Sequence, residues 1–262
     1  MKVFVGLLGL IGLLCLFGQP VKAQDESGML SANISNSLVT GINRNHKNVY
    51  NDFSVIGIYE WAEHIRSTLD LGFVKSFTQE KKAFLKDAVV GTSVSDIYTH
   101  PETEITLNGY GKLFLPLSQE SQKRSQIFAL TTGLGLSKDL SQFHFGYDLS
   151  GTYFANRFRT AKNGTSNKHY GMTNTLLIGF AFTDILALNT AWSLLNFATY
   201  NKSPKATYSF VQSLDYQATD ALGLSLGHSA GGRQYKNNGQ ELNIELFDVE
   251  GSELFLGLNY GF

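Results

Sequence analysis

Residues 227 to 231 read Gly-His-Ser-Ala-Gly and match the G-x-S-x-G pattern that carries the nucleophilic serine of many lipases and esterases. In such enzymes a histidine acts as the base that activates the serine, and an acid orients the histidine. This chemistry would make Ser229 a nucleophile for ester hydrolysis. The pattern works only where a strand enters a helix through a strained turn, so the elements around Ser229 decide the question.

The sequence around Ser229 predicts a strand that runs into a loop, with no helix. Leu222, Leu224 and Leu226 alternate with small residues, and a glycine-rich polar stretch follows Ala230. The α/β-hydrolase order also requires an acid and then a histidine after the serine, whereas all 6 histidines of this chain precede Ser229. We therefore interpret the five residues as the end of a strand whose glycines serve backbone bending.

The N-terminus has the parts of a secretory signal peptide. Lys2 precedes an apolar run from Val3 to Phe17, and a small-residue cleavage site ends at Ala23. We expect residues 1–23 to be removed, together with Cys15, the only cysteine. An exported chain without a thiol gains no stability from disulfides.

The C-terminus carries an apolar stripe that ends on an aromatic residue. Every second position from 254 onward is apolar, namely Leu254, Leu256, Leu258, Tyr260 and Phe262. This stripe resembles the C-terminal strand signal of Gram-negative outer-membrane β-barrel proteins, including the terminal phenylalanine. The resemblance implies integral insertion in the bacterial outer membrane, contact with its lipid including lipopolysaccharide, and recognition by the barrel-assembly machinery through this strand.

Period-two alternation, which a transmembrane strand requires, recurs along the chain. In residues 30–43 the even positions include Leu30, Ile34 and Leu38, while small polar residues fill most odd positions. The predicted strands are 30–43, 49–61, 65–77, 85–98, 103–116, 125–138, 142–157, 169–182, 186–198, 206–217, 221–230 and a C-terminal strand whose outer extension is 242–252. Alternation is weak in residues 84–116, and two strands are predicted there because short turns on one side must be separated by an even number of strands.

These strands predict an all-β fold. The connections at 61–65, 137–141, 183–185 and 218–221 are short, as periplasmic turns are, and the longer connections are predicted to lie outside. An unpaired strand edge is costly in hydrocarbon, so the sheet should close. We expect a closed antiparallel up-and-down transmembrane β-barrel of about twelve strands over residues 30–262, after the signal peptide and a short periplasmic segment, 24–29.

A second kind of hydrolase is also considered, because the outer-membrane phospholipase family is a twelve-stranded barrel. In that family one residue separates the histidine from the serine, which places both on one face of a strand. His228 and Ser229 are adjacent, so their side chains should point to opposite faces. The sequence therefore predicts no enzyme. It also predicts no cofactor, because no group of Asp, Glu, His and Cys has the spacing of a metal site.

The predicted inward face consists mainly of Ser, Thr, Gly, Ala and Asn, which leave room for water. The candidate lumen-lining residues with charged or titratable side chains are Asp52, Glu60, Arg66, Asp70, Lys112, His144, Asp148 and Asp215, and Tyr110 joins them. Acids outnumber bases in this set, which favours cations. The resulting hypothesis is a porin-like channel for passive diffusion of small hydrophilic solutes or ions, with a mild cation preference.

Three alternatives stay open from the sequence. The charges on the first strands could neutralise one another in a closed, non-conducting barrel, and loop residues such as Lys81, Lys82, Lys123 and Arg124 could bind lipopolysaccharide phosphates in a surface-interaction barrel. An enzyme that modifies outer-membrane lipid is the third. A net charge of −1 without any basic block excludes a nucleic-acid partner.

Overall fold

A computed structural model describes residues 29–42, 48–78, 81–236, 241–247 and 251–262 of the 262-residue chain. The expected signal peptide and residues 24–28 lie outside the described residues, as do the tips of several loops. No helix in the described part of the chain is long and apolar enough to cross a membrane.

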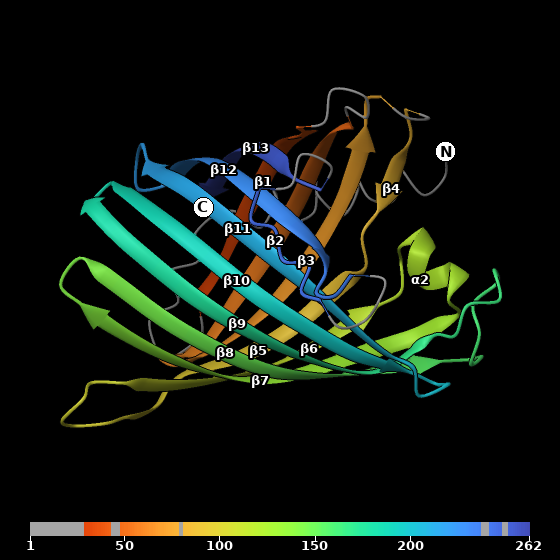
Figure 1. The fold of residues 1–262 in the computed structure, drawn as a ribbon. Helices are drawn as coiled ribbons and strands as arrows, with labels where there is room; N and C mark the ends of the chain where they lie inside the picture. The colour runs from red at the N-terminus through yellow and green to blue at the C-terminus, as the bar shows by residue number, and fades with distance from the viewer. Residues whose placement is uncertain (1–28, 43–47, 79–80, 237–240, 248–250) are drawn as a thin grey trace.

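The described strands form one antiparallel sheet that closes on itself (Figure 1). The first strand, β1 (Met29–Gly41), pairs with the last, β13 (Glu253–Gly261), and apart from the short β4 every strand between them pairs with the wall strands on either side of it. Those strands are β2 (Val49–Ala62), β3 (Ile65–Ser76), β4 (Ala83–Leu85), β5 (Ala88–Thr99), β6 (Thr106–Leu115), β7 (Gln126–Leu140), β8 (Phe143–Asn156), β9 (Lys168–Thr183), β10 (Leu186–Thr199), β11 (Pro204–Gln217) and β12 (Leu222–Arg233).

Twelve of the 13 strands in the described residues make up the barrel wall. The remaining strand, the 3-residue β4, pairs only with the end of β3, and β3 itself pairs with β5 to continue the wall. The fold predicted from the alternation is therefore confirmed. The weakly alternating region contains the two wall strands that the parity of the turns required, β5 and β6.

The two ends of the barrel differ. Short turns join β2 to β3, β7 to β8, β9 to β10 and β11 to β12 at one end, which we call the turn end. The opposite end, the loop end, carries the longer connections and the helix α2 (Gln119–Lys123), on the right in Figure 1. One turn lies further along the chain than predicted, because β7 and β8 stay paired as far as Leu140 and Phe143.

Residues 242–252 do not extend the last strand, and that prediction is wrong for the part of the segment that the structure describes. The pairing of β13 with β1 and with β12 begins at Glu253, which is the first residue of the strand. Leu242 instead bridges Tyr235, and the chain then crosses the outside of the barrel, where the Tyr208 hydroxyl donates to the Glu245 carbonyl at 2.9 Å. The alternating apolar residues of this segment therefore cover the wall rather than join it.

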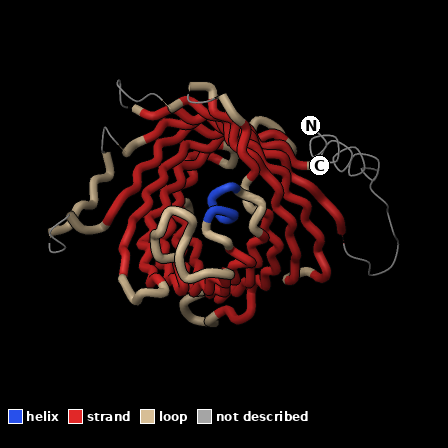
Figure 2. Tube along the Cα trace, turned by 90° about the vertical axis from the view of Figure 1, so that its right-hand side faces the viewer, coloured by secondary structure: helices blue, strands red, loops and turns tan. Residues whose placement is uncertain are grey.

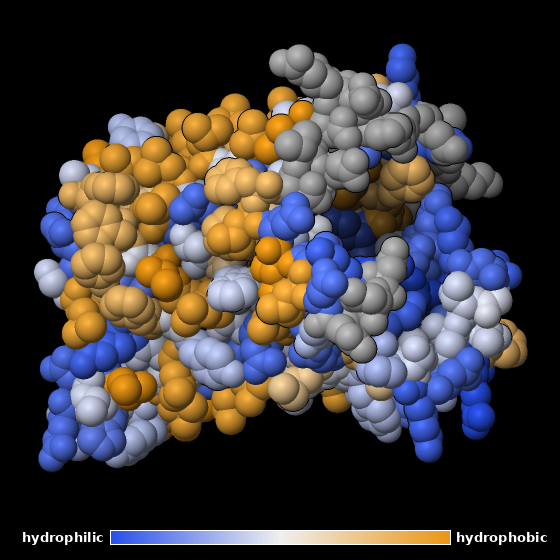
Figure 3. Space-filling model, in the orientation of Figure 1, coloured by the Kyte–Doolittle hydropathy of each residue, from blue (hydrophilic) through white to orange (hydrophobic). Residues whose placement is uncertain are grey.

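The outward face of the wall is apolar. Leu38, Leu256 and Leu226 stand side by side on β1, β13 and β12, and all three are exposed. Figure 3 shows apolar side chains gathered over the strands and polar ones at the loop end. Aromatic rings meet at both ends, with Phe143 against Phe180 at the turn end and Tyr153 against Tyr170 at the loop end. Such a belt between two aromatic girdles is typical of a wall that faces lipid.

Candidate functional site

The G-x-S-x-G residues lie within β12 and the strand continues to Arg233 without a helix. His228 points outward, 7% exposed, with its ring stacked on that of Phe247 at 4.4 Å, while the adjacent Ser229 points inward. A β-carbon on Gly227 would lie 2.2 Å from the Phe255 ring and 2.6 Å from the Gln212 carbonyl oxygen. Gly227 therefore makes room for a neighbouring ring, and His228 cannot act as a base for Ser229.

The inward face carries a cluster of charged side chains from β2, β3, β6 and the break between β4 and β5. The Lys86 ammonium lies 3.0 Å from Asp52, and Asp70 lies within electrostatic range of Lys86, Asp52 and Lys112. Lys86 comes from the short break between β4 and β5 and was not among the sequence candidates. The weak alternation around it gave no signal that its side chain turns inward.

A second inward contact joins β6 to β8. The Tyr110 hydroxyl donates to Asp148 at 2.9 Å, and the Lys112 ammonium stands 4.9 Å from the centre of the Tyr110 ring. A β-carbon on Gly133 would lie 2.4 Å from the Tyr110 ring, so this glycine lets the ring lie against the wall.

Sequence reasoning also missed residues on the inward face of β13. The Tyr50 hydroxyl donates to Glu253 at 2.8 Å, and Phe255 lines an inner cavity of about 310 Å³ that also contains Asp52 and Lys86. The alternation of this strand predicts that Glu253 and Phe255 face inward, but it does not indicate which distant residues they contact.

The remaining candidates lie toward the turn end. Arg66 is in register with Glu60 but its Nε donates to the Ser93 hydroxyl at 3.1 Å, and no ion pair joins it to Glu60 in the described structure. His144 lies 2.6 Å from Asp139, while Asp215 accepts hydrogen bonds from the side chains of Asn189 and Ser213. The sequence candidates therefore share the inward face without forming one cluster. The charges of the first strands do not all neutralise one another, and the ion pair observed there joins Asp52 to Lys86.

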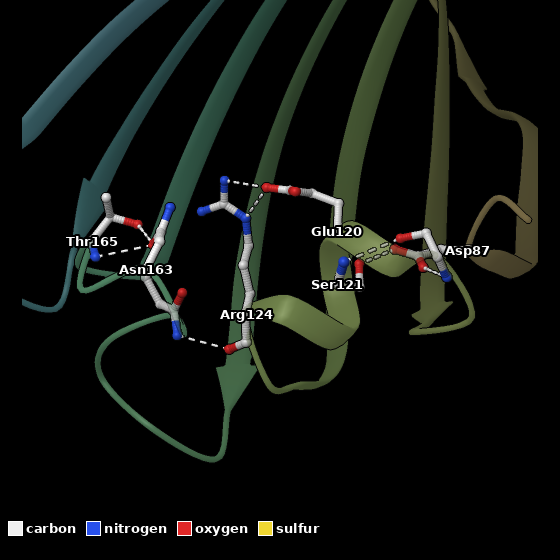
Figure 4. Close-up of polar contacts among 8 residues, drawn as sticks. Asp87, Glu120, Ser121, Arg124, Asn163 and Thr165 are labelled. Carbon is white, nitrogen blue, oxygen red and sulfur yellow. Dashed lines mark hydrogen bonds and ion pairs between the residues drawn. The ribbon is translucent and has the colours of Figure 1, made fainter. Parts of the chain in front are cut away.

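The helix α2 lies across the opening at the loop end. Looking along the barrel, Figure 2 shows it in the middle of the ring of strands. The carboxylate of Asp87, the residue before β5, accepts a hydrogen bond from the Ser118 amide at 2.7 Å. It accepts another from the Ser121 hydroxyl, as Figure 4 shows. The loop was predicted to be a surface loop, and the distant carboxylate that helps to hold it inward could not be identified from spacing.

The next long loop supports α2 from the other side. The fully buried Asn167 side chain donates to the carbonyls of Arg124 and Phe158 at 2.8 and 2.9 Å. Arg124, the residue that follows α2, pairs with Glu120 at 2.7 Å. The opening is thus crossed by a segment with anchors on two sides.

Lys168 points into the same opening. Its ammonium stands 4.4 Å from the centre of the Phe197 ring and 5.7 Å from that of Phe154, and Arg124 and Lys205 are close enough to act on its charge. A register shift where β9 meets Thr199 turns Lys168 inward, against the simple alternation.

A cavity of about 470 Å³ lies at the turn end. Asp184, Asp215 and Asp220 are among its lining residues, which include no lysine, arginine or histidine. Within the described ranges, no group of His, Cys, Asp and Glu side chains has the arrangement of a metal site.

Comparisons with known proteins agree with this geometry at the level of the fold. No protein-family model matches the chain, and neither does any curated protein. Among solved structures, the chain is similar to the COG4313 outer membrane channel from Pseudomonas putida F1, with a TM-score of 0.59 at 11% identity over 93% of this chain and 99% of that one. It is also similar to the NanC porin (TM-score 0.57, 11% identity, 87% and 98% covered) and the KdgM porin (0.54, 8%, 88% and 99%). The chain has the twelve-stranded fold of these outer-membrane barrels.

Proposed function

We propose that this protein is an integral barrel of the bacterial outer membrane and that small hydrophilic solutes diffuse passively through its lumen. The apolar outer wall with its aromatic girdles supports insertion in lipid. The short connections and the C-terminal residue belong to the turn end, which would face the periplasm.

The channel proposal rests on one observation, which is that charged side chains on the inward face are accessible to water. The Lys86 and Asp52 side chains keep 40% and 34% of their surface exposed although an apolar wall stands behind them. In a barrel filled by a packed core, an ion pair at this position would be dry. The proposed lumen therefore holds water around its fixed charges, as the lumen of a diffusion channel must.

We further propose that the lumen has a mild cation preference. Among the inward side chains, the acids Asp52, Glu60, Asp70, Asp148, Asp215 and Glu253 outnumber the bases Arg66, Lys86, Lys112 and Lys168. A ring of excess carboxylates attracts cations into a pore. The partners that this function implies are the solutes themselves, the surrounding lipid including lipopolysaccharide, and the barrel-assembly machinery at the C-terminal strand.

Neutralising a lumen acid tests this preference. In a planar bilayer with a KCl gradient, Asp70→Asn and Asp148→Asn are each expected to move the reversal potential toward zero, because each removes one negative charge from the wall. Glu241→Gln is the matched control, since Glu241 lies in an outer loop paired with Lys236 at 2.8 Å. Equal reversal potentials for wild type and both lumen variants would contradict the preference.

A further inference from the structure

The loop end of the barrel is basic around α2. Six cationic side chains come from α2, the loop that supports it and the neighbouring strand ends, namely Lys123, Arg124, Arg159, Lys162, Lys168 and Lys205. Backbone hydrogen bonds hold these segments together, with the Lys162 amide donating to the Lys123 carbonyl and the Asn167 amide to the Arg159 carbonyl. The acids beside them are Glu120, which pairs with Arg124, and Asp87, which keeps its charge while Ser118 and Ser121 donate to it, so the six bases still outnumber the two acids.

The turn end has the opposite charge. Asp184 and Asp220 lie in the turns beside the large cavity, and Asp215 lines the cavity on the inward face of β11. Because no base lines that cavity, this side of the entrance carries excess negative charge, while Arg66 lies on another strand at the same end.

The two charged entrances act independently at physiological salt. The 16 residues of β9 span the wall, and at about 3.3 Å per residue with a tilt near 40° the entrances are roughly 40 Å apart. The Debye length is about 8 Å at 0.15 M salt, so each entrance is screened from the other and gathers its own counterions. Between them, acids and bases alternate in Asp52, Lys86, Asp70 and Lys112.

We propose that the pore is bipolar and rectifies ion current, an inference that rests on the channel function proposed above. When the periplasmic side is positive, anions enter from the basic loop end and cations from the acidic turn end, so both accumulate in the lumen and conductance rises. When the polarity is reversed, each entrance repels the ion that the field drives toward it, and the lumen is depleted. The protein therefore passes more current with the turn end positive than with the loop end positive.

Single-channel recording of the refolded full-length barrel tests the proposal. At 0.1 M KCl the currents at opposite voltages should differ by roughly twofold or more, because potentials of one or more kT at each entrance change local ion concentrations by such factors. At 1 M KCl the difference should fall close to one, since the Debye length shrinks from about 10 Å to about 3 Å.

The orientation of each channel must be known, because the sign is part of the prediction. Lys202→Cys places a thiol on an exposed turn at the loop end, and the only native cysteine, Cys15, lies in the expected signal peptide. Biotin-maleimide followed by streptavidin, added to one chamber, marks the side on which the loop end lies. The larger current is expected when the other chamber is positive.

Variants that remove charge at one end of the barrel measure how much that end contributes to the current ratio. Asp184→Asn with Asp220→Asn, and independently Lys123→Gln with Lys162→Gln, should each bring the current ratio at 0.1 M KCl closer to one. The double variant Lys236→Gln with Glu241→Gln removes a paired base and acid at the loop end and should leave the ratio unchanged. Symmetric current at low salt, the opposite sign, or indifference to both sets of variants would overturn the bipolar pore while leaving the channel intact. A folded barrel without any conductance would instead overturn the proposed function.

Discussion

Asp87→Ala is expected to increase the single-channel conductance and to add flicker between levels. In the wild type, the Asp87 carboxylate accepts hydrogen bonds from the Ser118 amide and the Ser121 hydroxyl and so anchors α2 across the opening. Alanine removes both acceptors. A hydrogen bond to a charged group contributes about 1.5–3 kcal/mol. Losing even one should therefore change the equilibrium constant between the state with α2 across the opening and the state with α2 displaced by a factor of roughly 10 to 100.

The control for this variant is Glu120→Gln. Glu120 pairs with Arg124 on the surface of the same helix, with a side chain that is largely exposed, and it does not hold the helix to the wall. Its loss should therefore change conductance little. If Asp87→Ala conducts like the wild type while the barrel remains folded, α2 does not restrict the opening.

A reversible disulfide between position 87 and α2 provides the complementary test of whether α2 restricts the opening. Asp87 and Ser121 are in side-chain contact, so Asp87→Cys with Ser121→Cys is expected to form a disulfide when oxidised. The oxidised double variant should show the steady wild-type level, and reduction should give the larger, flickering conductance of Asp87→Ala. Because both states belong to one protein, the comparison does not depend on differences in folding.

Leu256→Arg is expected to destabilise the barrel by about 2–4 kcal/mol, the cost of a guanidinium on the lipid face near the bilayer midplane. Leu256 is exposed between Leu38 and Leu226, with no polar neighbour in register on either side. Urea unfolding of the protein in lipid vesicles, followed by tryptophan fluorescence, measures the change.

The matched variant is Ser225→Arg, in register with Gly257 and Asp215 on the inward face. An arginine there meets water and a carboxylate, so its cost should be well below that of Leu256→Arg. Similar losses for both variants would show that the apolar face does not stand in lipid.

The barrel wall could be predicted from the sequence because lipid requires each strand to carry apolar side chains on its outward face. One face of each wall strand must be mainly apolar, and in β13 the alternation of Leu254, Leu256 and Leu258 makes this requirement visible in the sequence. Turn parity was equally informative, since it required two strands where alternation alone was weak. These constraints are local, and they need no knowledge of distant contacts.

What the sequence could not reveal depends on contacts between distant segments. The parity of Leu242, Ile244 and Leu246 suggested a strand, but a segment with the same pattern can lie across the outer wall, as the His228 and Phe247 stack shows. The inward turn of Lys86, the Tyr50 contact with Glu253 and the anchoring of α2 by Asp87 each join residues far apart in the chain. No spacing rule identifies such pairs.

The ion current through purified, refolded protein in a planar bilayer tests most directly whether the lumen is open to water. We expect stable current steps of uniform size from a barrel whose folded state is verified by its heat-dependent gel mobility. A correctly folded barrel that inserts in the bilayer but passes no current would contradict the water-filled lumen and would favour a closed structural or surface-binding barrel.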